Sequence, residues 1–189
     1  MYNRNLNYAN GDPMTPQLYP DPAPPLMTSL ALLSLVLGGA IFGFFYAWIC
    51  STMWGLDAAD PAVAISAMQA MNASVRNAVF APAFFGTPVV LFLTAWVAWG
   101  QSRMAAAKAF LAAGLVYLIG GLVATMAVNV PMNEALALVS IPDSPEAARQ
   151  IWSEYSGKWQ VWNIARTVAS GISLALIGLG LMQIRQVQN

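Results

Sequence analysis

Four stretches of this sequence are long enough and apolar enough to cross a lipid bilayer, and they constrain the fold more than any other feature. They run from Met27 to Cys50, from Pro82 to Trp99, from Ala109 to Val128 and from Ile164 to Met182. A membrane-spanning helix needs roughly 20 predominantly apolar residues. We therefore predict an all-α fold, a multi-pass integral membrane four-helix bundle whose main partner is the lipid bilayer.

The composition excludes several classes of function. Charged residues make up 8% of the chain, whereas soluble domains carry about 25%. The eight basic residues balance the eight acidic ones, so no basic surface is available for nucleic acid. Cys50 is the single cysteine and histidine is absent. These are the usual ligands of transition metals, and we therefore predict no metal site and no cofactor.

Three regions follow from the apolar runs. Residues 1–26, rich in Asn and Pro, predict an extended N-terminal arm, either a disordered tail or an arm that lies along a partner subunit. Residues 27–185 form the four-span membrane domain, and 186–189 form a C-terminal tail. The basic residues flanking the spans divide evenly between the two sides. Discounting Arg76 and Arg166, which fall at membrane depth, predicts that both termini are cytoplasmic.

The segment between the first two spans predicts an interfacial helix. Apolar residues recur there at helical spacing, with Gln69, Asn72 and Arg76 as a polar stripe beside them. Asp60 is suited to cap the helix start, and Pro61 is suited to its first position.

The connection between the third and fourth spans is too polar for lipid and too patterned for a simple linker. We expect Asn129 to end the third span and Pro131 to break it, so that Asn133 and Glu134 turn back towards the bundle. Several hydrogen-bonding groups would then meet at one level and form one wall of a pocket.

A polar and aromatic stripe enters the fourth span. Steps of three or four residues, which share one helix face, connect Trp152, Tyr155, Trp159, Trp162 with Asn163, Arg166 and Ser170. An arginine in the apolar zone costs about 2.5–3.5 kcal/mol, so Arg166 should face the interior and have a hydrogen-bonding partner. The candidate partners are Glu134, Glu154, Asp57, Asn129 and Asn133. The alternative that Arg166 has a purely structural role and only ties helix ends together stays open.

Three short motifs resemble one membrane protein family. "MQAMN" at 68–72, "NVPMNEAL" at 129–136 and "W..Y...W..WN..RT" from Trp152 to Thr167 resemble the DUF1772 family, also known as the anthrone oxygenase family. The resemblance covers roughly residues 27–185 and implies a small four-helix membrane protein. Some fungal members are similar to enzymes that oxidise anthrones to anthraquinones with dioxygen, without a dedicated metal or flavin. The resemblance implies no catalytic residue set.

Two functions from different classes remain open, and whether the chain is an enzyme is undecided. One is a cofactor-independent oxygenase of a planar phenolic substrate, which needs a base, an aromatic slot and donors for the developing oxyanion. The candidate bases are Tyr155, Glu134 and Asp57. The candidate ligand-binding residues are Asn129, Asn133, Trp159, Trp162, Asn163 and Arg166.

The other function is a non-catalytic accessory subunit of a larger membrane complex. Such a subunit would hold a quinone, lipid or pigment, or pack against other subunits or a second copy of itself. The glycine-bearing apolar spans and the N-terminal arm suit that function equally well. A transporter is disfavoured because no internal repeat is visible.

Overall fold

The structure, a computed structural model, describes residues 23–184. The predicted tail at 186–189 and all but the last residues of the predicted arm lie outside these residues. Within residues 23–184 the chain forms helices and no strand. In order they are α1 (Pro25–Ala47), the π-helical segment η1 (Trp48–Thr52), α2 (Met53–Ala58), α3 (Pro61–Ser74), α4 (Phe80–Gly100), α5 (Met104–Val116), the π-helical segments η2 (Tyr117–Val123) and η3 (Thr125–Asn129), α6 (Val130–Ala137) and α7 (Pro145–Gln183).

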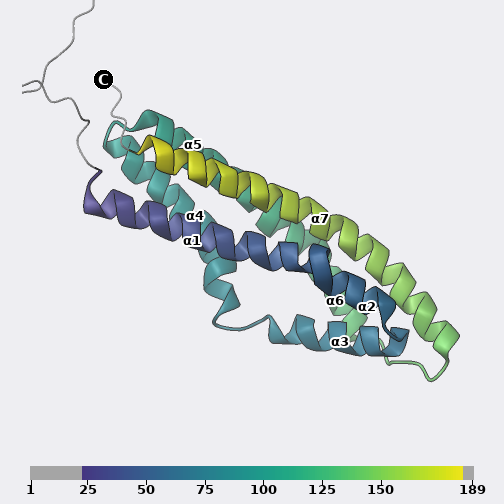
Figure 1. The fold of residues 1–189 in the computed structure, drawn as a ribbon. Helices are drawn as coiled ribbons and strands as arrows, with labels where there is room; N and C mark the ends of the chain where they lie inside the picture. Colours follow the sequence, from purple (N-terminus) through teal and green to yellow (C-terminus); the bar gives the residue numbers. More distant parts are fainter. Residues whose placement is uncertain (1–22, 185–189) are drawn as a thin grey trace, which may run out of the picture.

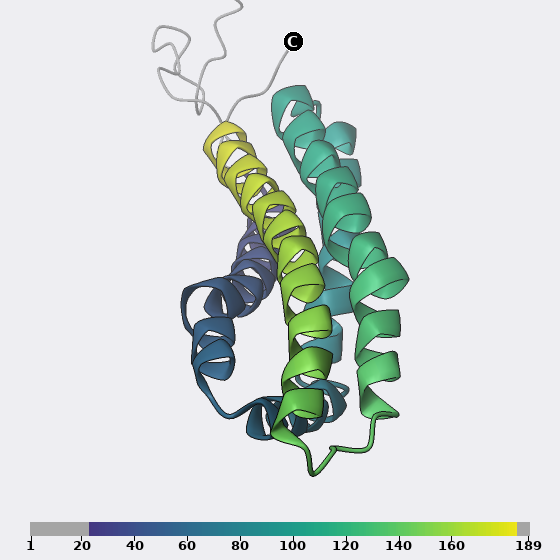
Figure 2. The same cartoon turned by 90° about the vertical axis from the view of Figure 1, so that its right-hand side faces the viewer.

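Four continuous helices are long and apolar enough to cross a membrane, as the sequence predicted. They cover Pro25–Ala58, Phe80–Gly100, Met104–Ala137 and Pro145–Gln183. Helix α1 packs against α4 and α7, and α5 packs against the same two helices, so the spans form a four-helix bundle (Figures 1 and 2). The fold class is therefore an all-α membrane bundle.

Small residues let the fourth span pack closely against its neighbours. A Cβ atom at Gly38 would lie 2.7 Å from the side chain of Ile177, and one at Gly120 would lie 2.5 Å from Cβ of Ala169. Without a hydrophobic driving force between helices in lipid, such close backbone approach is a main source of packing energy.

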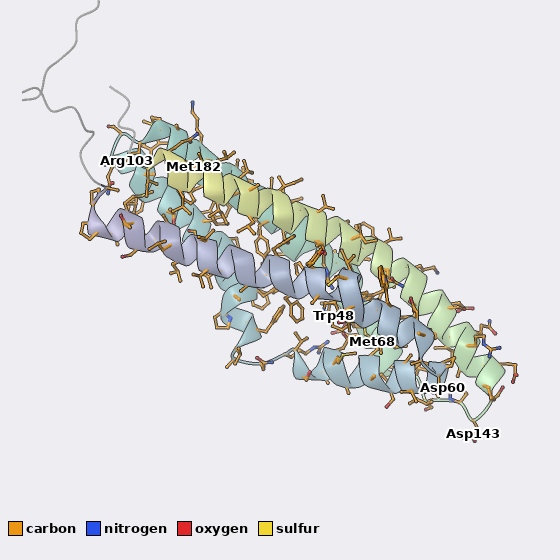
Figure 3. All side chains as sticks on the ribbon, viewed as in Figure 1. Trp48, Asp60, Met68, Arg103, Asp143 and Met182 are labelled. Atoms are coloured by element: carbon orange, nitrogen blue, oxygen red, sulfur yellow. The ribbon has the colours of Figure 1, made fainter. Side chains whose placement is uncertain are left out.

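Three of the spans continue well beyond the length of α4. Helix α4 has 21 residues, about 30 Å of helix, whereas α7 has 39 residues, about 58 Å. The bilayer core is only about 30 Å thick. The surplus, which consists of α2, α6 and the first half of α7, forms a cap together with the separate helix α3. Figure 3 shows Asp60 and Asp143 at the tip of this cap, with Arg103 and Met182 at the opposite end of the molecule.

Polar contacts hold the cap together. The Asp57 carboxylate accepts hydrogen bonds from Trp152 Nε1 at 2.9 Å, Ser156 Oγ at 2.6 Å and Gln160 Nε2 at 2.9 Å. The Gln69 amide donates to the backbone carbonyls of Leu136 and Val139. These bonds fasten α2 to α7 and α3 to the end of α6.

The predicted helix between the first two spans is present as α3. The Asp60 side chain accepts from the backbone N–H groups of Ala62 and Val63, and Pro61 begins the helix. Residues 75–79 then connect α3 to α4. There the Asn77 side chain accepts from the N–H groups at the start of α4, which satisfies donors that a helix start leaves free.

The predicted break of the third span at Asn129 and Pro131 is wrong. The helix continues from Met104 to Ala137, passing through η2 and η3 before α6. Because η2 and η3 have already replaced α-helical hydrogen bonding with wider turns, the missing N–H of Pro131 does not stop the helix. Asn133 and Glu134 consequently extend the third helix into the cap instead of turning back.

Candidate functional site

A large cavity lies where the four-span bundle meets the cap. Its volume is about 1020 Å³, and its wall is formed by the end of α1, η1, the end of α3, residues 75–79, the start of α4, η3, α6 and α7. The aromatic residues in this wall are Phe44, Phe45, Trp48, Phe80, Phe84, Phe85 and Trp159. A mostly apolar cavity with a few polar groups is the usual form of a small-molecule site.

The aromatic rings of the wall pack against one another across three spans. The rings of Phe44 and Phe80 lie 4.9 Å apart, and those of Trp48 and Trp159 lie 5.0 Å apart. The Phe80 ring also stacks on that of Phe84 at 5.2 Å. Contacts of this kind stabilise the wall and give it flat apolar surfaces.

A proline and a tyrosine fix the wall at Phe84. Pro88 lies inside α4 and has no N–H to donate to the carbonyl of Phe84, four residues earlier. Tyr117 on the third span instead donates its hydroxyl to that carbonyl at 2.9 Å, and the bond is buried. Because Pro88 leaves the carbonyl of Phe84 free to accept from Tyr117, this hydrogen bond joins α4 to the third span beside the cavity.

Arg166 is the buried cation of the site. Its side chain lines the cavity, and the residue is only 5% exposed. Nε donates to Oδ1 of Asn163 at 2.9 Å, and Nη1 donates to Oγ1 of Thr125 at 3.3 Å. The guanidinium carbon lies 4.4 Å from the ring centre of Phe45 and 5.0 Å from that of Trp159. The expectation that Arg166 faces the interior and has a hydrogen-bonding partner is confirmed.

The amide that binds Arg166 is none of the predicted partners. Among residues 23–184 the one salt bridge joins Arg76 to Glu134, so Arg166 has no carboxylate counterion there. Burial of a charge normally requires an opposite charge or several hydrogen bonds. The guanidinium is held instead by neutral oxygens and two aromatic faces, and its positive charge remains directed at the cavity.

Asn133 links two candidate residues of α7. Its Oδ1 accepts from the hydroxyl of Tyr155 at 2.8 Å and from Nε1 of Trp159 at 2.9 Å. Asn133 and Trp159 line the cavity, whereas Tyr155 is buried behind them and does not. The amide therefore fixes the indole of Trp159 in the wall.

The three candidate bases occupy different environments. Glu134 lines the cavity at its rim, where it pairs with Arg76 at 3.2 Å, and both side chains are more than half exposed. Asp57 lies in the cap with three donors on its carboxylate, away from the cavity wall. The hydroxyl of Tyr155 donates a hydrogen bond to Oδ1 of Asn133. Of the three, only Glu134 borders the cavity.

The remaining candidates support the wall from behind or lie outside it. Asn163 is buried and donates to the carbonyl of Phe45 at 3.3 Å. Asn129 is buried and donates to the carbonyl of Trp159, while its Oδ1 has no partner among the described residues. Trp162 is 41% exposed at the edge of the helix stripe and does not line the cavity.

The sequence reasoning missed the contribution of α1 and the start of α4. Phe45, Trp48, Phe80 and Phe84 supply much of the wall. Their signal is the density of aromatic residues in "FGFFYAW" at 42–48 and "FAPAFFG" at 80–86. Over the described range, no group of three or more acidic or cysteine side chains is arranged to hold a metal ion.

Comparison with known proteins gives a family match. The model of the family described as anthrone oxygenase matches residues 71–176, which include the end of α3, all of α4 to α6 and most of α7. Phe45 and Trp48 of the cavity wall lie before the matched residues, whereas Glu134, Trp159 and Arg166 lie within them. No curated protein and no solved structure matches the chain.

Proposed function

The chain belongs to the anthrone oxygenase family, and from this premise we propose that it oxidises a planar phenolic substrate with dioxygen, without a cofactor. The observation that carries the proposal is Arg166, a buried guanidinium that faces the cavity with no carboxylate partner in the described part of the chain. A preorganised cation in a water-poor site stabilises negative charge that develops on a reacting substrate.

The shape and lining of the cavity support a flat aromatic substrate. Its volume of about 1020 Å³ is ample for three fused rings, since drug-sized ligands occupy cavities of roughly 300–1,000 Å³. The aromatic residues of the wall, among them Trp48, Phe80 and Phe84, give the cavity an apolar surface against which a flat ring system can pack. The substrate oxygen that carries the negative charge would lie beside the guanidinium.

Glu134 is the proposed proton acceptor. It is the carboxylate that lines the cavity, whereas the carboxylate of Asp57 is occupied by three donors of the cap. Its ion pair with Arg76 is exposed on both sides, and exposed pairs of this kind are worth only about 0–1 kcal/mol. The Glu134 carboxylate can therefore give up its ion pair with Arg76 and accept a proton from the substrate at little cost in free energy.

The reaction balances without another reactant. Glu134 removes a proton from a ring methylene, and the carbanion spreads its charge onto the ring oxygen beside Arg166. The electron-rich ring transfers electrons to dioxygen, and a C–O bond forms at the methylene carbon. Protonation of the peroxide, loss of the second hydrogen and cleavage of the O–O bond release water and leave a carbonyl, so that R₂CH₂ and O₂ become R₂C=O and H₂O.

The test is turnover of anthrone by the purified protein in lipid nanodiscs. With ¹⁸O₂ as oxidant, we expect one labelled oxygen in the anthraquinone and the other in water. Arg166→Met should abolish turnover while Arg166→Lys, which keeps the charge, should retain part of it. Arg103→Met is not suitable as a control because Arg103 bonds to the Ile184 carbonyl, so the matched control is Lys108→Met on the exposed surface.

Two results would count against the enzyme. Equal anthrone oxidation by protein-free nanodiscs and by the wild-type protein would show that the chain contributes nothing to the reaction. Tight binding of anthraquinone without any turnover, in a folded wild-type protein, would instead support the accessory function, in which the chain only holds such a molecule.

A further inference from the structure

The cavity has two rims of opposite character. One rim carries Arg76, Asn77 and Glu134, all exposed and polar. The other carries Val79, Phe85 and Met126, which are 87%, 50% and 44% exposed and entirely apolar. A ligand that reaches the cavity from water would pass the first rim, and one that comes from hydrocarbon would pass the second.

The apolar rim lies between two membrane-spanning helices. Phe85 belongs to α4 and Met126 to the third span, and both helices have the length and hydropathy of spans. Helix α4 packs along α5 and reaches η2, but it has no packing contact with η3 or α6. The two spans therefore diverge where η3 follows η2, and the cavity, which Phe85 and Met126 line, borders this gap.

In a bilayer spanned by α4, the gap would lie near one edge of the hydrocarbon core. The start of α4 at Phe80 is about 30 Å of helix from its other end at Gly100, which equals the hydrocarbon thickness. Phe85 is one to two turns inside that boundary. Exposed apolar side chains at this depth face acyl chains, because lipid is the solvent there.

We propose that the gap between Phe85 and Met126 is a lateral portal through which the cavity takes its planar aromatic ligand from the lipid leaflet. This inference rests on the proposed function for the identity of the ligand. Flat polycyclic phenols are poorly soluble in water and concentrate in the bilayer, so a lipid-facing entrance gives them a short path to Arg166. The polar rim then serves water and protons rather than the ring system.

The experiment blocks each rim in turn with a reversible adduct. Met126→Cys, Arg76→Cys and Ile119→Cys are each made in a Cys50→Ser background and treated with benzyl methanethiosulfonate, which is uncharged. Ile119 is the matched control because it is 65% exposed on the same span as Met126 and does not line the cavity. Stopped-flow quenching of tryptophan fluorescence by 1,8-dihydroxyanthraquinone follows binding, since Trp48 and Trp159 line the cavity.

An adduct at position 126 should lower the association and dissociation rate constants together, by about tenfold or more, and leave Kd unchanged. Dithiothreitol should restore both rates, the adduct at position 119 should have no effect, and the adduct at position 76 should slow binding far less than the adduct at position 126. Phe85→Ala, which widens the gap, should raise both rates. Slowing by the position 76 adduct instead, or unchanged rates in both the position 126 adduct and Phe85→Ala, would overturn the portal. Absence of probe binding to the unmodified protein would overturn the proposed function itself.

Discussion

Arg166 and Asn163 lie one turn apart on α7 and are hydrogen-bonded through Nε and Oδ1 at 2.9 Å. The same asparagine donates its Nδ2 to the carbonyl of Phe45 on α1. One amide therefore orients the guanidinium and ties it to the first span. With one face near Phe45 and another near Trp159, the cation has a fixed position and an unneutralised charge.

The first prediction concerns a variant that gives Arg166 a carboxylate partner. Thr125 accepts from Nη1 of Arg166 at 3.3 Å, so Thr125→Asp should place a negative charge next to the guanidinium. The new carboxylate would lie close to the negatively charged oxygen of the bound ligand, and like charges at close range cost several kcal/mol. We therefore expect the affinity for 1,8-dihydroxyanthraquinone to fall by about tenfold or more. Thr125→Asn, which introduces a side chain of the same size as aspartate but without its charge, is the control and should bind the ligand normally. Equal losses in the two variants would mean that the charge of Arg166 is not used.

The second prediction concerns Tyr117 and Pro88. Tyr117→Phe should destabilise the protein by about 0.6–1.7 kcal/mol, the range of side-chain hydrogen bonds within membranes, because the carbonyl of Phe84 loses the hydroxyl that donates to it. In a Pro88→Ala background the new backbone N–H can bond to that carbonyl, so Tyr117→Phe should cost much less. Unfolding of the four proteins in mixed micelles, treated as a double-mutant cycle, measures this coupling. Equal costs in both backgrounds would exclude the compensation.

The third prediction separates the candidate bases. Glu134→Gln should abolish anthrone turnover with little change in stability, since its salt bridge is exposed. Asp57→Asn should leave turnover largely intact and loosen the cap, because Trp152, Ser156 and Gln160 lose charge-assisted bonds. Hydrogen exchange of residues 145–160 reports that loosening. Loss of turnover in Asp57→Asn alone, with normal exchange, would transfer the proton-accepting role to Asp57.

The fourth prediction tests the close packing of the third and fourth spans. Gly120→Ala should destabilise the bundle by about 1–3 kcal/mol, because the added methyl group would lie 2.5 Å from Cβ of Ala169. Gly178→Ala, where the new methyl group meets no atom within 4 Å, is the control. It should be neutral or slightly stabilising, since alanine is the better helix former. Thermal unfolding in detergent compares the two variants.

The spans and the α7 stripe could be predicted from sequence because both are local patterns. An uncharged apolar run must satisfy its backbone internally in lipid and hence forms a helix. Steps of three and four residues place Trp159, Asn163 and Arg166 on one face whatever surrounds them. Their burial follows from the cost of exposing an arginine to lipid.

The rest of the site depends on which helices become neighbours. No periodicity in "FGFFYAW" indicates that Phe45 would meet Arg166, which lies far along the chain. The continuation of the third helix past Pro131 depends on π-helical turns, which have no clear sequence signal. For the same reason Glu134 was expected near Arg166, whereas the longer helix carries it to Arg76 at the rim.

The central claim is that Arg166 holds a negatively charged oxygen of a planar ligand, and the absorption spectrum of a bound phenol tests it most directly. At a pH where free 1,8-dihydroxyanthraquinone is neutral, we expect the probe bound to the wild-type protein to show the long-wavelength band of its ionised form. Arg166→Met should bind it, if at all, with the neutral spectrum, whereas Arg76→Met should behave as the wild type. A neutral spectrum for the wild-type complex, or an ionised one for Arg166→Met, would contradict the account.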